Sequence, residues 1–67
     1  MFRITNTSTK SAVISNDPEV AYNTVLKWTG NHEEAVEASS WVEIADIDSE
    51  YYGESFIITF ENSDINA

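Results

Sequence analysis

Residues 16–19 read Asn-Asp-Pro-Glu, and they separate a strand-like segment from a helix-like one. The Asp17 carboxylate can accept a hydrogen bond from a free amide of a helix, Pro18 suits the first helical position, and Glu19 favours the positive end of the helix dipole. Apolar side chains then recur at spacings of three and four, which is typical of a helix with one buried face. Because glycine readily adopts the left-handed conformation that ends helices, we expect this helix to end at Gly30.

A second helix is predicted directly after the first. Asn31 and Glu34 are three residues apart, as in a capping box, in which each side chain accepts a hydrogen bond from the other residue's backbone amide. An apolar stripe over residues 35–45 includes Trp41, and the glutamates of the same segment project elsewhere, toward solvent. We expect this helix to end near residues 46–47.

Three strands are predicted around the two helices. Residues 2–5 and 11–15 are short apolar segments joined by a polar stretch, which predicts a hairpin. Residues 55–61 show the clearest strand pattern, because apolar side chains recur at every second position. The acidic and aromatic segment 48–54 is expected to form a loop.

The expected order is therefore strand, strand, helix, helix, strand, in one domain over residues 1–67 with residues 62–67 as a frayed tail. The simplest packing is a small two-layer α+β domain, in which an antiparallel sheet carries both helices on one face. We expect the last strand, the most apolar one, to pair with the first. A chain of 67 residues without cysteine has a limited core and no disulfide, so its stability depends on packing and on any self-association.

The charge of the chain is large and uneven. The formal net charge is −9. Residues 1–27 hold two acidic and three basic side chains, whereas residues 28–67 hold ten acidic side chains and no lysine or arginine. The second segment cannot neutralise itself by local ion pairs, so the folded protein has to tolerate repulsion between like charges.

This distribution argues against direct nucleic-acid binding, which needs lysine and arginine to neutralise phosphates. It favours the reverse arrangement, an acidic surface that occupies a basic surface of a nucleic-acid-binding protein or nuclease complex. Tyr51 and Tyr52 are adjacent, so in an extended segment one of them points outward and can add an aromatic contact. The candidate partner-binding residues are Glu33, Glu37, Glu43, Asp46, Asp48, Glu50, Tyr51, Tyr52 and Glu54.

Catalytic and metal chemistry find little support in the sequence. His32 is the only histidine, it lies in the first turn of the second helix, and there is no cysteine, so we predict no enzyme activity and no cofactor. The acidic residues from Asp46 to Glu54 resemble the start of a calcium-binding loop, but that loop requires glycine at its sixth position and glutamate at its twelfth. Those positions hold Tyr51 and Ile57, so no dedicated metal site is predicted, and weak binding of a divalent cation stays open.

Simpler interpretations exist for the same residues. An acidic face on a small domain often serves only to keep it in solution. Trp28 and Trp41 each fall on an apolar stripe and are expected to belong to the core. Residues 1–3 do not begin a signal peptide, and no apolar stretch is long enough to span a membrane, so we expect the protein in the cytoplasm.

The segment Ala38-Ser39-Ser40-Trp41-Val42-Glu43-Ile44-Ala45, with the acidic loop and Ser55-Phe56-Ile57-Ile58-Thr59 after it, resembles small acidic proteins of bacteriophages and mobile elements. Some proteins of that group are anti-CRISPR inhibitors, and some of those imitate DNA. The resemblance implies inhibition of a host defence complex in the cytoplasm of the host cell. It assigns no functional residue.

Two other classes of function fit the same composition. One is an antitoxin-like or accessory protein that neutralises a single dedicated basic partner. The other is a structural homodimer in which exposed aromatic side chains pair. Salt separates these classes, because screening strengthens a dimer of two acidic subunits and weakens an acidic–basic complex.

Overall fold

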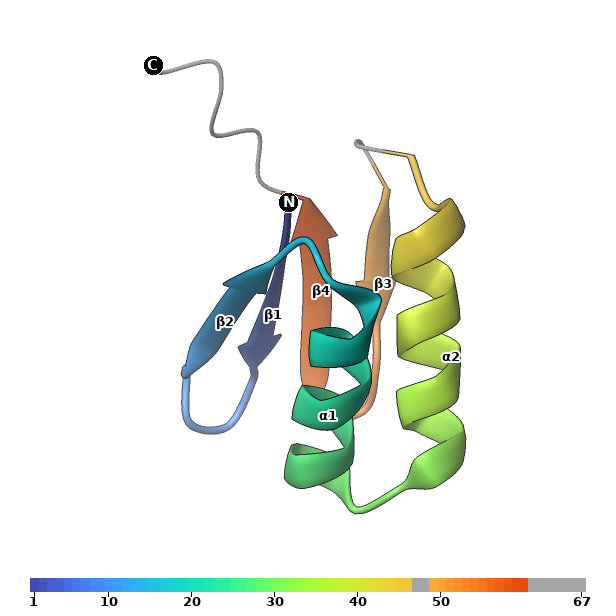
Figure 1. Ribbon diagram of the computed structural model, residues 1–67. Helices are drawn as coiled ribbons and strands as arrows, with labels where there is room; N and C mark the ends of the chain where they lie inside the picture. The colour runs from blue at the N-terminus through green and yellow to red at the C-terminus, as the bar shows by residue number, and fades with distance from the viewer. Residues whose placement is uncertain (47–48, 61–67) are drawn as a thin grey trace.

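The computed structural model describes residues 1–46 and 49–60. In this part of the chain, strands and helices follow one another in the order strand, strand, helix, helix, strand, strand (Figure 1). The elements are β1 (Phe2–Asn6), β2 (Ala12–Ser15), α1 (Pro18–Thr29), α2 (His32–Ile44), β3 (Glu50–Tyr52) and β4 (Phe56–Phe60).

The strands form one antiparallel sheet in the order β2-β1-β4-β3. Both helices lie against the same face of this sheet (Figure 1). The first and last strands are its two central strands, and Phe2 is paired with Phe60. The predicted two-layer α+β domain, the opening hairpin and the pairing of the last strand with the first are confirmed.

The structure corrects one prediction, because the segment 48–54 is not entirely a loop. Its residues 50–52 form β3, which pairs with β4 and places Tyr51 opposite Ile58. The Gly53 amide donates a hydrogen bond of 2.8 Å to the Phe56 carbonyl oxygen and closes the turn between the two strands. A strand of three residues is too short to show an alternating pattern, so only its pairing with β4 reveals it.

The turn of the first hairpin forms without an Asn-Gly pair. The Asn6 side-chain oxygen accepts hydrogen bonds from the backbone amides of Ser8 and Thr9, at 2.9 and 3.0 Å. Lys10 adopts the left-handed conformation, with φ of 67°, at the position where a glycine is common. An asparagine side chain can thus order a turn whose sequence lacks the usual glycine.

The limits of α1 are those that its capping residues predict. Asp17 Oδ1 accepts a hydrogen bond of 2.9 Å from the Glu19 amide, and Pro18 is the first helical residue. Gly30 is left-handed, with φ of 68°, and its amide donates to the Leu26 carbonyl oxygen at 2.8 Å.

Only half of the capping box predicted for α2 is formed. Asn31 Oδ1 accepts a hydrogen bond of 3.2 Å from the Glu34 amide. The Asn31 amide, however, donates to Thr29 Oγ1 at 3.0 Å rather than to the Glu34 carboxylate. At its other end α2 stops at Ile44, slightly before the predicted limit, because Ala45 is extended with ψ of 150°.

The core lies between the sheet and the two helices. Its fully buried members are Phe2, Ile4, Phe56 and Ile58 from the sheet and Ala21, Val25, Ala35 and Ala38 from the helices. The small helical side chains let the backbones of α1 and α2 approach each other closely. Trp28 and Trp41 are partly buried and pack against this core, as predicted.

Candidate partner-binding surface

The helix α2 and the strand β3 lie together at one end of the sheet (Figure 1). Three aromatic side chains link them. The ring centroids of Trp41 and Tyr51 are 5.6 Å apart, and Tyr51 stacks on the buried Phe56 at 5.8 Å with an interplanar angle of 17°. Residues that are ten positions apart in the chain are therefore held side by side.

This arrangement gathers the acidic side chains of residues 28–46 and 49–60 at one end of the molecule. They lie on α2, in the segment after it, on β3 and in the turn after β3, and all except Glu34 are exposed. We call this set the acidic edge, and its members are Glu33, Glu34, Glu37, Glu43, Asp46, Glu50 and Glu54.

Within residues 1–46 and 49–60, no ion pair joins a carboxylate of the acidic edge to Lys10 or Lys27. The three cationic side chains lie on other elements, Arg3 on β1, Lys10 in the first hairpin turn and Lys27 on α1. The charge imbalance along the sequence therefore becomes a charge imbalance between the two ends of the domain.

The negative charge of the acidic edge affects the pKa of the Tyr51 hydroxyl. Its pKa is raised above 10.0, first by burial and then by the negative charges of Glu37 and Glu34. Both carboxylates thus act on the same phenol from one side of α2. The sequence assigned Glu34 only to the helix cap, because its influence on Tyr51 arises only once α2 lies beside β3. The Glu34 carboxylate does not accept the bond that the capping box predicted, since the Asn31 amide donates to Thr29 Oγ1 instead.

The raised pKa of Tyr51 predicts a loss of stability in alkali. Between pH 10.0 and the higher pKa of the folded protein, unfolding lets Tyr51 ionise, so the free energy of unfolding falls as the pH rises through this window. Below pH 10.0 the contribution is constant. Urea unfolding at several pH values should therefore show a steeper alkaline decline for the wild type than for Tyr51→Phe, and parallel declines would contradict the assignment.

Tyr52 points to the other side of β3, so one tyrosine is turned in and one out, as predicted. Its side chain is 67% exposed. The Tyr52 hydroxyl donates a hydrogen bond of 2.8 Å to Glu50 Oε1, and this bond is the main cause of its raised pKa. Glu50 and Tyr52 therefore occupy the sheet face that is turned away from the helices, while the glutamates of α2 occupy the helical layer.

Two exposed aliphatic side chains accompany the acids on α2. Ile44 is 81% exposed and Val36 is 41% exposed. Val36 borders a shallow depression of about 390 Å³ together with His32, Glu33 and Glu37. Sequence reasoning did not select these two residues, although both fall outside the apolar stripe that it assigned to the core.

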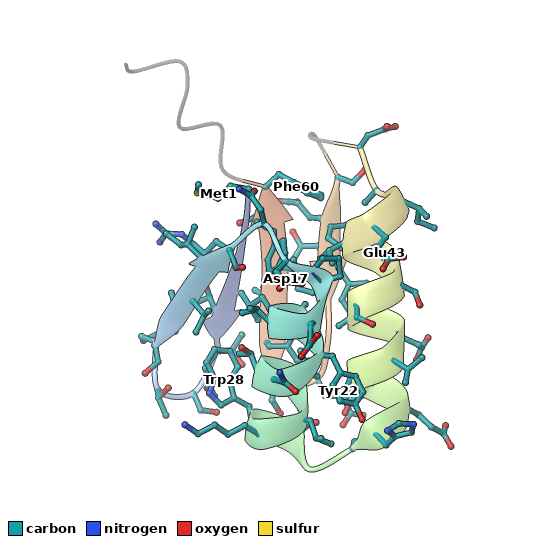
Figure 2. The ribbon with its side chains drawn as sticks, viewed as in Figure 1. Met1, Asp17, Tyr22, Trp28, Glu43 and Phe60 are labelled. Carbon is teal, nitrogen blue, oxygen red and sulfur yellow. The ribbon has the colours of Figure 1, made fainter. Side chains whose placement is uncertain are left out.

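His32 is exposed, as expected, and has one neighbour that the sequence did not suggest. Its Nδ1 is 2.7 Å from the Tyr22 hydroxyl, and the two rings meet edge to face at 5.6 Å. Figure 2 shows Tyr22 on the side of α1 that faces α2. The pair joins the two helices.

Among the described residues, no three His, Asp or Glu side chains are grouped closely enough to hold a metal ion. None of their helices is long and apolar enough to cross a membrane.

Most of the predicted site residues are thus brought to one end of the molecule, although not onto one plane. Glu33, Glu37 and Glu43 project from α2, and Figure 2 shows Glu43 near its last turn. Asp48 lies outside the described residues.

Comparisons of the chain with protein-family models, with curated protein sequences and with solved structures gave no match, so its function has to be inferred from its own residues.

Proposed function

We propose that the protein is a non-enzymatic inhibitor of the phage type, which binds through its acidic edge to a basic surface on a host protein that handles nucleic acids. The resemblance to small acidic phage proteins suggests a defence complex as the target. In this proposal the inhibitor acts in the cytoplasm of the host cell and needs no cofactor. It does not bind nucleic acid itself.

The observation that carries the proposal is the position of the carboxylates. A domain that needed charge only to stay in solution could distribute acids and bases over its whole surface. Here the described acids of residues 28–60 are concentrated on α2, on β3 and beside them, and neither Lys10 nor Lys27 pairs with them. Concentrated charge of one sign produces a field that extends beyond the surface and speeds the approach of a cationic partner.

The exposed aliphatic side chains supply a second kind of contact. Surface charge pairs contribute mainly to association rate and specificity, whereas desolvated apolar side chains contribute more of the affinity. Ile44 and Val36 lie on the same helix as Glu33, Glu37 and Glu43. A basic groove with apolar patches would therefore match α2 better than a uniformly cationic surface would.

The proposal is tested by comparing two variants that carry the same net charge. The first changes Glu37, Glu43 and Glu54 to glutamine. The second leaves the acidic edge intact and places three lysines on exposed positions at the other end, as Ser8→Lys, Ser11→Lys and Asn16→Lys. Each protein is immobilised, exposed to a nuclease-treated bacterial lysate, and eluted with a gradient of sodium chloride.

We expect the wild type and the lysine variant to retain a basic nucleic-acid-binding protein that elutes at moderate salt. The glutamine variant should bind that protein at least about tenfold more weakly, which corresponds to about 1.4 kcal/mol spread over three charges. The purified partner should then lose a bound DNA duplex when the wild type is added. Equal weakening of both variants would mean that net charge matters and the acidic edge does not.

A further inference from the structure

The sheet has a second face, which the helices do not cover. Side chains alternate between the two faces of a strand, so the residues between the buried ones of β1 and β4 point to this open face. The registers place them in two rows across the strand order β2-β1-β4-β3. One row runs Ile14, Arg3, Thr59, Glu50, and the other runs Ala12, Thr5, Ile57, Tyr52.

The open face is much less charged than the helical side. Its two rows hold one cation and one carboxylate, and half of the side chains in them are apolar or aromatic. Ile14 is 47% exposed and Tyr52 is 67% exposed, both large values for such side chains in a sheet. Of the carboxylates in residues 1–46 and 49–60, a second, equally acidic molecule therefore meets few on this side.

We propose that two copies of the chain associate through their open faces. In such a dimer each pair of helices lies on the outside. The two copies of α2 then lie on opposite sides of the two stacked sheets, so the distance between them is about 20 Å or more. This exceeds the screening length of about 8 Å at physiological ionic strength, so the glutamates of the two helices hardly repel each other.

The uneven charge also selects the orientation of the two copies. A two-fold axis parallel to the strands places β2 of one copy over β3 of the other, and β1 over β4. The β3 edge of each face, which carries Glu50, then lies over the β2 edge of the other copy and not over a second Glu50. An axis perpendicular to the strands would instead place β3 over β3 and bring two acidic ends together.

The same axis brings side chains of complementary size together. Ala12 of one copy faces the position of Tyr52 in the other, so a small residue receives a large ring. The hydrogen bond from Tyr52 to Glu50 already holds that ring on the open face. The four strands have three to five residues each and offer a face of about 19 by 15 Å, or about 300 Å² per copy. This is well below the standard interface of about 800 Å² per partner, so the dimer should be weak and should dissociate on dilution.

Sedimentation equilibrium over a range of protein concentrations tests the association. Ile14→Glu puts a carboxylate on the open face, and Ile44→Glu makes the same substitution on the outer side of α2. We expect Ile14→Glu to raise the dissociation constant at least about tenfold and Ile44→Glu to leave it unchanged. A monomeric wild type at every concentration, or equal effects of the two variants, would overturn the proposal.

Salt separates this inference from the proposed function. Raising sodium chloride from about 0.05 to about 0.5 M should strengthen the dimer, because the repulsion between two negatively charged copies is screened. The same change should weaken the complex with a basic partner. A dimer without a partner, or a partner complex without a dimer, would each reject only one of the two proposals.

The orientation is tested by disulfide trapping, since the natural chain has no cysteine that would interfere. Ala12→Cys and Tyr52→Cys are prepared as separate proteins and mixed under oxidising conditions. The proposed axis places these two positions opposite each other, whereas two copies of Ala12→Cys lie three strand spacings apart, about 14 Å. Cross-linking in the mixture but not in Ala12→Cys alone is expected, and the reverse result would reject this axis.

Discussion

Phe56→Ala is expected to remove a large part of the free energy of unfolding. Phe56 is the first residue of the central strand β4, its side chain is fully buried, and Tyr51 stacks on its ring. Removing a buried phenylalanine ring costs about 3–5 kcal/mol, because apolar contacts are lost and a cavity remains. A domain of this size has little stability to spare, since whole domains are stable by only about 5–15 kcal/mol.

Urea unfolding followed by tryptophan fluorescence and circular dichroism measures this loss. Phe60→Ala is the matched control, because it makes the same change in β4 at a partly buried position and should cost clearly less. Phe56→Leu retains much of the buried side-chain volume, so its free energy of unfolding can still be measured if Phe56→Ala does not fold. A Phe56→Ala protein within about 1 kcal/mol of the wild type would show that the core is not centred on this ring.

Gly53→Ala is expected to lower the free energy of unfolding by about 1–3 kcal/mol, an unusual cost for adding one methyl group in a turn. A Cβ at this position would lie 2.6 Å from Cζ and 2.9 Å from Cδ1 of Phe56. Carbon atoms do not approach so closely, so the ring would have to move. It is fully buried and stacked against Tyr51, so its movement would disturb the packing between β3 and the core.

Gly30→Ala provides the contrast. A Cβ at Gly30 would have no atom within 4 Å, and the substitution meets only the cost of a left-handed residue, about 1–2 kcal/mol. A double-mutant cycle separates the two causes. Gly53→Ala should cost less in a Phe56→Leu background, whereas Gly30→Ala should cost the same in both. Additive effects at Gly53 and Phe56 would contradict the steric explanation.

The elements that the sequence predicted well are those with local signals. Asp17, Pro18 and Gly30 mark both ends of α1 through chemistry that acts within a few residues. The alternation in β4 is long enough to be recognised without its neighbours. The position of Tyr51 and Tyr52 on opposite sides of an extended segment also followed from geometry alone.

The features that sequence reasoning missed depend on distant partners. Three residues of β3 become a strand because β4 pairs with them. The bond between Tyr22 and His32 requires α1 and α2 to pack against each other. Glu34 could be assigned only to a local cap, since its influence on Tyr51 appears once α2 lies beside β3. Local patterns cannot contain such information.

The central position of β4 has a consequence for how the domain forms during synthesis. Its residues are among the last of the described chain to leave the ribosome, yet they pair with β1, among the first to leave it. Until then Phe2 and Ile4 have only the hairpin and the helices as neighbours, and their apolar surface stays accessible to chaperones or to other nascent chains. Because that pairing closes a long loop, the sheet can be completed only after β4 has been synthesised.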